Sequence, residues 1–143
     1  MKEVKKIFRI VVVEDSEFFN NLLTRQLRHY TEALALEKNC RFEVQSFTNA
    51  SDCLRNINSE TDIAFVDFYL GSGLTADDVL EKFKKRCKDC KVVIMSQVRN
   101  LKTSIMTMAK GALDFIFKDI HALPRACFLV EEIVDKKLRY RNN

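Results

Sequence analysis

The sequence predicts an α/β protein with a doubly wound, five-stranded parallel sheet that is covered by helices on both faces. Short runs rich in β-branched and aromatic residues alternate with segments whose apolar residues recur every three or four positions. Most of these short runs are apolar throughout, as expected for parallel strands buried on both faces. The length of 143 residues, with 47% hydrophobic residues, suits one domain with one core.

Five short runs have the composition of strands. The second, "RFEVQSF", alternates between polar and apolar residues, whereas the others are almost wholly apolar. The predicted strands are residues 7–13, 41–47, 62–68, 91–96 and 113–118. Because each is followed by a helical pattern, the β-α unit is repeated five times, which indicates a parallel sheet.

Five segments have the spacing of amphipathic helices. Ser16 can cap the first, Gly111 is expected as the C-cap of the fourth, and Pro124 is expected to open the last. The predicted helices are residues 17–37, 49–57, 76–87, 100–110 and 124 to about 138. Residues expected on their inner faces include Leu54, Ile57, Val79, Leu80, Phe83, Phe128, Leu129, Ile133 and Leu138.

The charge balance is mildly basic. The formal net charge is +4, and basic residues are scattered among acids, as in "EKFKKRCKDCK", which is typical of a solvated helix face. No nucleic-acid recognition motif is visible, so direct nucleic-acid binding is not expected. The apolar run near the start is too short for a signal peptide, and no segment reaches the roughly 20 apolar residues of a membrane span. A cytoplasmic protein without membrane contact is expected.

The five cysteines are read as structural residues. Cys40, Cys53 and Cys127 lie in or beside apolar patterns and are predicted to be small core residues. Cys87 and Cys90 form a C-x-x-C, but no second ligand pair accompanies them, as a zinc site requires. They also close a helix instead of opening one, unlike a thioredoxin-type pair. The motif is therefore interpreted as a coincidence.

Polar side chains stand where four of the predicted strands end. Glu14 and Asp15 follow the first, Asp67 ends the third, Ser96 ends the fourth and Lys118 ends the fifth. Because the carboxyl ends of parallel strands share one edge of the sheet, these groups are expected to meet in one crevice. Three carboxylates form a hard oxygen site of the kind that Mg²⁺ prefers. Without a cation, at least one carboxylate should have a raised pKa.

This set of groups is suited to phosphoryl transfer. Asp67 can act as a nucleophile and form an acyl phosphate. Lys118 and a bound cation would offset the phosphoryl charge, and Ser96 would donate a hydrogen bond to a phosphoryl oxygen. Each group alone has an ordinary structural interpretation as a cap, a turn residue or a solvated side chain. Their joint occurrence at four strand ends favours the functional interpretation.

With these residues the sequence resembles a receiver domain of two-component response regulators, of the CheY-like kind, from Ile7 to about Leu138. The matching motifs are Glu14-Asp15, Asp67 in "FVDF", Ser96 in "VVIMS", Lys118 in "GALDFIFK", and Gly111-Ala112 with the aromatic Phe115. The resemblance implies a flavodoxin-like (βα)5 fold with strand order 2-1-3-4-5. It also implies a signalling switch with no catalysis beyond autophosphotransfer and self-dephosphorylation.

The resemblance implies a role for each acid of the crevice. Asp67 would be the phosphoacceptor and would receive its phosphoryl group from a histidine kinase or a phosphotransfer protein. Asp15 would bind Mg²⁺ directly and Glu14 mostly through water. Asp67 and the backbone carbonyl of Tyr69 would complete the metal site.

The remaining implied roles concern the switch. Ser96 and Lys118 would bind the phosphoryl oxygens, and Phe115 would move inward as Ser96 shifts. The fourth helix, fifth strand and fifth helix, about residues 100–138, would form the output face toward a downstream protein, an output domain or a second copy. Ile105, Met106 and Met108 could support such a dimer, although apolar residues at helical spacing are more often core. The sequence is expected to hold a single receiver domain over residues 1–143, without an output domain.

Four residues depart from the family pattern. Phe115 lacks a tyrosine hydroxyl, so it can act through packing but cannot donate a hydrogen bond. Gln97 follows Ser96 where a small residue is usual, so it could crowd the phosphoryl group. Asp119 follows Lys118 where proline is usual, which leaves the geometry of this peptide bond open. Gly71 stands where proline is common after the phosphoacceptor, so a looser loop is expected there.

Two other functions fit the sequence less well. A phosphorylation-independent adaptor should have lost an acid, Ser96 or Lys118, and all of them are present. A metal-dependent phosphatase should have a further general acid near Asp67. Of the two histidines, His29 is expected far along the first helix, and His121 is expected past the fifth strand as a loop or cap residue.

Overall fold

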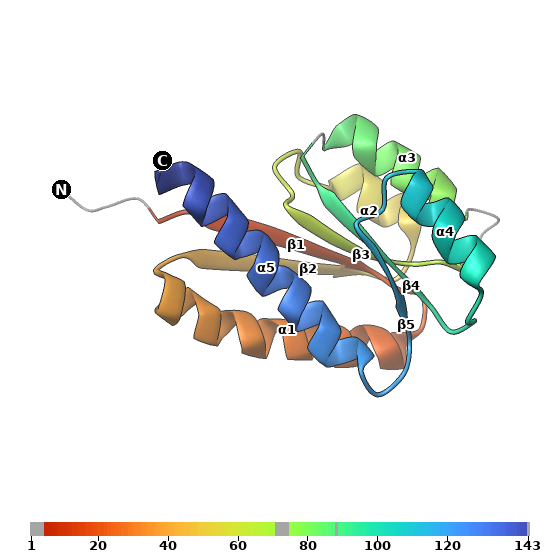
Figure 1. Cartoon of the computed structure of the whole chain (residues 1–143), viewed down its shortest axis with the longest axis horizontal. Coiled ribbons are helices and arrows are strands. Elements are labelled where there is room, and N and C mark those ends of the chain that lie inside the picture. The colour runs from red at the N-terminus through yellow and green to blue at the C-terminus, as the bar shows by residue number, and fades with distance from the viewer. Residues whose placement is uncertain (1–4, 71–74, 88, 143) are drawn as a thin grey trace.

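In the computed structural model, which describes residues 5–70, 75–87 and 89–142, strands and helices alternate along the whole chain (Figure 1). The strands are β1 (Ile7–Val13), β2 (Arg41–Phe47), β3 (Ile63–Asp67), β4 (Lys91–Ser96) and β5 (Asp114–Phe117). The helices are α1 (Glu17–Lys38), α2 (Ala50–Asn56), α3 (Ala76–Arg86), α4 (Leu101–Ala109) and α5 (Ala122–Asn142). The expected β-α order is therefore confirmed.

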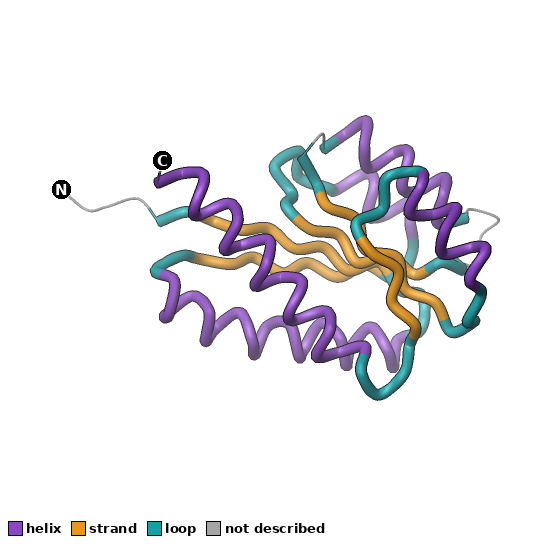
Figure 2. The backbone as a smooth tube through the Cα atoms, in the orientation of Figure 1, coloured by secondary structure: helices purple, strands orange, loops and turns teal. Residues whose placement is uncertain are grey.

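All five strands pair in parallel, in the order β2-β1-β3-β4-β5. The order reverses at β1, which lies between β2 and β3, so the chain folds to both sides of its first strand. In an open parallel sheet this switch in strand order opens a crevice at the carboxyl ends of the strands. Figure 2 shows the strands converging on the end where β1, β3, β4 and β5 run into their loops. The predicted fold is confirmed.

Helices cover both faces of the sheet. α1 and α5 lie on one face, and α2, α3 and α4 lie on the other (Figure 1). The central strands β1, β3 and β4 are buried on both sides, so alternate residues of one strand enter different cores. In β1, Phe8 and Ile10 pack with the α1 and α5 side, and Val11 and Val13 with the α2 and α3 side. This explains why β1, β3 and β4 read as continuous apolar runs.

Side-chain caps fix the helix starts. The Ser16 hydroxyl accepts a hydrogen bond from the N–H of Phe19, at 3.3 Å, as its place before α1 predicts. Thr75 and Asp78 form a reciprocal capping box at the start of α3. At the other end of α4 the C-cap is Lys110, and Gly111 follows it with φ of +105°, which a glycine adopts at little cost. The expectation that Gly111 itself is the C-cap was one residue off.

The predicted inner faces of α4 and α5 need correction. Phe128 is 60% exposed, while Leu129 and Ile133 are buried as predicted. α5 begins at Ala122, two residues before Pro124, which fits in its first turn because the N–H groups there need no helical partner. Ile105, Met106 and Met108 were expected as core, but all three face solvent. α4 lies at the margin of the sheet, where the polar Thr107 is its buried residue.

The cysteines lie inside the protein. All five are free and buried, which confirms the expected core positions of Cys40, Cys53 and Cys127. Burial raises the pKa of Cys53 and of Cys90 to about 12, so both are held as thiols. Gly71 and the rest of residues 71–74 lie outside the described residues, so the loop expectation there is untested. Within the described chain, no helix combines the length and apolar composition of a membrane span.

Candidate functional site

The strand ends bring the three predicted carboxylates together. Oxygens of Glu14, Asp15 and Asp67 lie within 4.8 Å of one another. Glu14 is fully buried and Asp67 is 5% exposed, whereas Asp15 is open to solvent. The cluster therefore has two acids set into the protein and one at its mouth, which is the convergence that the sequence predicts.

Lys118 joins two of these acids. Its Nζ atom lies 2.7 Å from Oε2 of Glu14 and 3.1 Å from Oδ1 of Asp67. It also lies over the ring of Phe19, 4.8 Å from the centroid. The Lys118 side chain is only 5% exposed, so the ammonium group is held where water screens it little. One buried cation thus pairs with the two buried carboxylates of the cluster.

The two carboxylate oxygens of Glu14 have different partners. Oε1 accepts a hydrogen bond from the N–H of Ser16, at 3.1 Å. Oε2 is buried, and no described residue donates it a hydrogen bond. Its 2.7 Å approach to Lys118 is therefore an ion pair without hydrogen-bond directionality. A buried carboxylate oxygen with unused acceptor capacity is one that a cation or its water can satisfy.

Asn20 is a site residue that sequence reasoning missed. Its side-chain amide donates to the backbone carbonyls of Glu14 and Phe47, each at 3.1 Å, and its Oδ1 accepts from the hydroxyl of Thr24 at 3.0 Å. It is buried and ties the end of β1 to the end of β2 and to α1. In the sequence, Asn20 lies at helical spacing from Leu23 and Leu27, which marks the inner face of the helix but does not indicate a role at the site.

The environment changes the protonation of Asp67. Burial, and next the negative charge of Glu14, raise the pKa of Asp67 from 3.8 to about 7, although Lys118 acts in the opposite direction. The burial and repulsion therefore outweigh the single ammonium group. This confirms the expectation that one carboxylate has a raised pKa when no cation is bound.

Ser96 lies at the same edge, with its hydroxyl engaged elsewhere. The hydroxyl accepts a hydrogen bond from the N–H of Val98, at 3.0 Å, and donates to the Val98 carbonyl at 3.1 Å. The backbone of Ser96 accepts from the N–H of Lys118 at 2.8 Å. Gln97 is exposed. Ser96 is thus tied through its backbone to Lys118 and through its side chain to the loop before α4.

Two aromatic residues join the Asp67 loop to β5. Phe115 is half-buried, and its ring meets that of Phe68 edge to face, with centroids 6.3 Å apart. Phe68 follows Asp67 directly and packs against Tyr69, with centroids 4.7 Å apart. The N–H of Tyr69 donates to Oδ1 of Asp67 at 3.4 Å. The aromatic contacts therefore run from the Asp67 loop to β5.

Asp119, which stands where proline is usual in the family, stabilises the turn after β5. The Lys118–Asp119 peptide bond is trans. Asp119 accepts a hydrogen bond from the N–H of His121 at 2.8 Å and pairs with Arg99 at 3.5 Å. Arg99 also lies over the ring of Phe117, 4.3 Å from the centroid. The loops after β4 and β5 are thereby joined at the surface.

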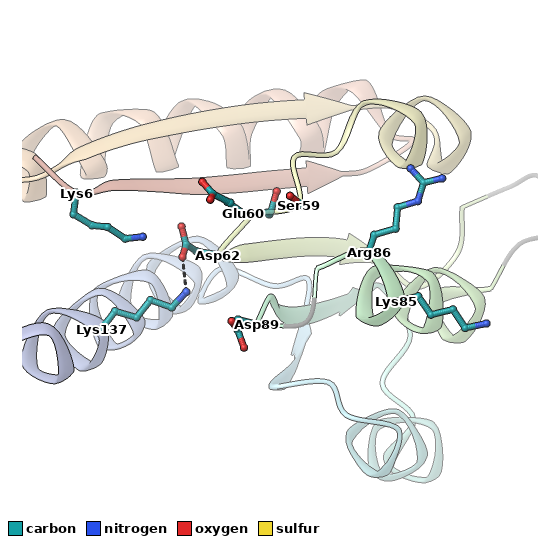
Figure 3. Close-up of a pocket in the computed structure, with 9 residues that line it drawn as sticks. Lys6, Ser59, Glu60, Asp62, Lys85, Arg86, Asp89 and Lys137 are labelled. Carbon is teal, nitrogen blue, oxygen red and sulfur yellow. Dashed lines mark hydrogen bonds and ion pairs between the residues drawn. The ribbon is translucent and has the colours of Figure 1, made fainter. Parts of the chain in front are cut away.

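A second hollow lies at the opposite end of the sheet (Figure 3). It has a volume of about 490 Å³ and is lined by polar and charged residues from the loop before β3, the segment before β1, α3 and the loop after it, and α5. The buried Asp62 accepts from the N–H of Arg9 at 2.8 Å and pairs with Lys137. Figure 3 shows Lys85 pointing away from this hollow. Both carboxylate oxygens of Asp62 have partners, so the cluster has a structural role and holds β3, β1 and α5 together.

Comparison with known proteins places the chain in a family. The family model described as response regulator receiver domain matches residues 10–124. The chain belongs to this family. The Two-component response regulator-like PRR73 proteins of Oryza sativa subsp. indica and subsp. japonica are each 28% identical to this receiver domain over 122 residues, which is 80% of the chain. The chain spans 14% of the length of these relatives.

Solved structures share the fold of this receiver domain. A response regulator receiver domain protein from Clostridium thermocellum has a TM-score of 0.74 at 20% identity, covering 93% of this chain and 98% of that one. NtrX from Brucella abortus in complex with ATP has a TM-score of 0.75 at 24% identity, covering 94% of this chain and 28% of that one. The BeF3-activated DrrB receiver domain has a TM-score of 0.72 at 13% identity, over 90% of this chain and 98% of that one.

Proposed function

We propose that this receiver domain is a phosphorylation switch in which Asp67 accepts a phosphoryl group. The observation that carries the proposal is the convergence of Glu14, Asp15, Asp67 and Lys118 at the carboxyl edge of the sheet. The likeness to a receiver domain activated by BeF3 supports it. The donor would be a histidine kinase or a phosphotransfer protein, and five buried thiols suit a reducing, cytoplasmic location.

The acidic cluster fits a Mg²⁺ ion. Asp15 and Asp67 would be its side-chain ligands, Glu14 would act through water, and the backbone carbonyl of Tyr69 would add a further oxygen. The buried Oε2 of Glu14 supports this assignment, because it accepts no hydrogen bond from a described residue and, beside its ion pair with Lys118, keeps acceptor capacity that a metal-bound water can use. When bound, the ion would neutralise part of the charge on the transferred phosphoryl group.

The transfer itself requires little from the protein beyond positioning. A carboxylate oxygen of Asp67 attacks phosphorus as the bond from phosphorus to the donor nitrogen breaks, and the released imidazole keeps the electron pair and takes up a proton. The product is an acyl phosphate on Asp67. Lys118 already lies 3.1 Å from that carboxylate, so its charge is in place to stabilise the added negative charge.

The signal would leave the site through Ser96. Its hydroxyl would give up its hydrogen bonds to the Val98 backbone and donate one to a phosphoryl oxygen. The loop between β4 and α4 would then move with Ser96. Phe115, which contacts the Asp67 loop through Phe68, would then repack inward. Arg99 lies on the same loop, so its ion pair with Asp119 on the loop after β5 would be remodelled with it.

The receiving surface would be the α4–β5–α5 face. Its exposed apolar residues include Leu101, Ile105, Met106, Met108 and Phe128. Side chains of this size on one face mark a protein-binding surface. The partner would be a downstream protein, an output domain or a second copy of the chain.

Phosphorylation with acetyl phosphate tests the proposal. The protein is incubated with acetyl phosphate and Mg²⁺, and its intact mass is recorded beside Asp67→Ala and Asp89→Asn, which alters an exposed acid. We expect one added phosphoryl group in the wild type and in Asp89→Asn, none in Asp67→Ala, and none when EDTA replaces Mg²⁺. An unmodified wild type would favour the phosphorylation-independent adaptor, and a mass gain that persists in Asp67→Ala would overturn the assignment of Asp67.

A further inference from the structure

The outer edge of β2 runs along a groove that the phosphorylation site does not use. β2 ends the sheet on the side opposite β5, beside α1 (Figure 1). Two hollows, of about 480 and 290 Å³, lie between α1 and this strand and share Arg28 and Glu32. The strand residues that line them are Phe42, Val44 and Ser46. We propose that this groove binds an extended, acidic segment of a partner protein as an added strand.

The backbone of β2 is set up for such pairing. The N–H of Arg41 donates to Lys6 at 2.9 Å, and the carbonyl of Phe47 accepts from Glu14 at 3.0 Å, so the odd-numbered residues turn toward β1. Backbone groups alternate along a strand, so Phe42, Val44 and Ser46 direct theirs away from the sheet. These are the same residues that line the groove.

The outward backbone groups are largely unused. Among the residues that the structure describes, the N–H groups of Phe42, Val44 and Ser46 have no hydrogen-bond acceptor. The Val44 carbonyl accepts from the guanidinium group of Arg28 at 3.0 Å. An edge with free donors and acceptors is the template on which an extended peptide adds as a strand.

The charge of the groove selects the partner. Its α1 wall carries Arg25, Arg28 and His29, all exposed, against the single acid Glu32. Arg28 uses one of its five N–H donors on Val44, which leaves others for a carboxylate. Two copies pairing through this edge would bring these basic walls together, whereas an acidic segment would be attracted. The groove therefore favours an acidic partner over self-association.

Binding is tested with defined peptides and the full chain. The probes are short extended peptides in which Glu or Asp alternates with Val or Thr, and the matched probes carry Lys at the acidic positions. Affinity is measured by fluorescence anisotropy, and the binding position by amide chemical shifts and hydrogen exchange. We expect the acidic peptides to bind and to protect the amides of Phe42, Val44 and Ser46.

Two variant pairs separate backbone pairing from charge. Ser46→Pro deletes an outward N–H without removing a bond to β1, and Ser46→Ala keeps it. Arg25→Glu reverses a charge in the groove, and Lys102→Glu makes the same change at an exposed position of α4. We expect Ser46→Pro and Arg25→Glu each to weaken binding by about tenfold or more, with little change in the two controls.

The outcomes that overturn the proposal are distinct. Equal binding of acidic and Lys-containing peptides, shifts confined to the α4–β5–α5 face, or no saturable binding at millimolar peptide would each contradict it. Concentration-dependent shifts of the β2 amides in the protein alone would show that a second copy is the occupant. None of these results depends on phosphorylation of Asp67.

Discussion

The ammonium group of Lys118 lies 2.7 Å from Oε2 of Glu14, and both side chains are almost completely buried. The same ammonium group is 3.1 Å from Asp67. The ends of β1, β3 and β5 are thus joined by one cation. Because a buried charge without a partner is costly, this lysine supports the fold as well as the chemistry.

Removal of Lys118 should therefore lower stability, and Mg²⁺ should restore part of it. Without the ammonium group, Glu14 and Asp67 are left as uncompensated buried acids. We expect Lys118→Ala to lose about 3–5 kcal/mol of unfolding free energy without divalent cations. Urea denaturation measures the loss, and addition of Mg²⁺ should reduce it.

Lys110→Ala is the matched control for this loss. Lys110 pairs with Asp77 at 2.8 Å, but its side chain is 51% exposed, so its removal should cost less than about 1 kcal/mol. Equal losses in the two variants would contradict the view that burial makes the Lys118 ion pairs important.

The raised pKa of Asp67 should make stability depend on pH. In the folded, metal-free protein its pKa is raised to about 7 by burial and by Glu14, against 3.8 as the ordinary value. The folded protein keeps this proton after the unfolded chain has released it. Stability should therefore fall as the pH rises between those two values.

Asp67→Asn should remove this pH dependence. Its gain in unfolding free energy over the wild type should be small near pH 4 and reach on the order of 3 kcal/mol above pH 7. Thermal or urea denaturation across the pH range in EDTA checks this. A gain that does not grow with pH would show that Asp67 is not protonated in the folded protein.

Asn20 should matter for both stability and metal affinity. Asn20→Ala leaves the carbonyls of Glu14 and Phe47 without their side-chain donor, so we expect a loss of about 2 kcal/mol or more. Because the Glu14 backbone is then less fixed, Mg²⁺ affinity should fall several-fold. Asn21→Ala alters the exposed neighbour on α1 and is the control. Mg²⁺ titration monitored by amide shifts separates the two effects, and unchanged affinity in Asn20→Ala would contradict the positioning role.

Ser96 should couple the phosphoryl group to α4. Ser96→Ala retains Asp67, so phosphorylation with acetyl phosphate should persist, but the amide shifts of α4 on phosphorylation should be strongly reduced. Lys118→Ala should likewise reduce the amide shifts of α4 that phosphorylation causes. Ser51→Ala, at an exposed position of α2, should behave as wild type. Full α4 shifts in phosphorylated Ser96→Ala would show that the signal takes another route.

Much of the fold was readable because each strand is bounded by charged or turn residues. The limits of β1, β2 and β4 were predicted to the residue, since a charged or polar residue directly follows each of these runs. Helix faces were harder. Phe128 and Leu129 are adjacent, and one residue is about 100° around a helix, so spacing alone did not decide which of the two is buried.

Most of the site residues could also be predicted from the sequence, and Asn20 could not. Glu14, Asp15, Asp67, Ser96 and Lys118 could be predicted because parallel strands end at one edge. Asn20 could not, because its role depends on the end of β2 lying against that of β1, which no local pattern encodes. The Ser96 hydrogen bonds to Val98 likewise follow from loop geometry. The exposed apolar side of α4 reflects its place at the sheet margin.

The most direct test of the central claim is to locate the phosphoryl group. After incubation with acetyl phosphate and Mg²⁺, borohydride reduces an aspartyl phosphate to homoserine, and tandem mass spectrometry identifies the converted residue. The account predicts homoserine at position 67, lost in EDTA. Conversion at another residue, or a stable phosphoryl group that borohydride does not reduce, would contradict it.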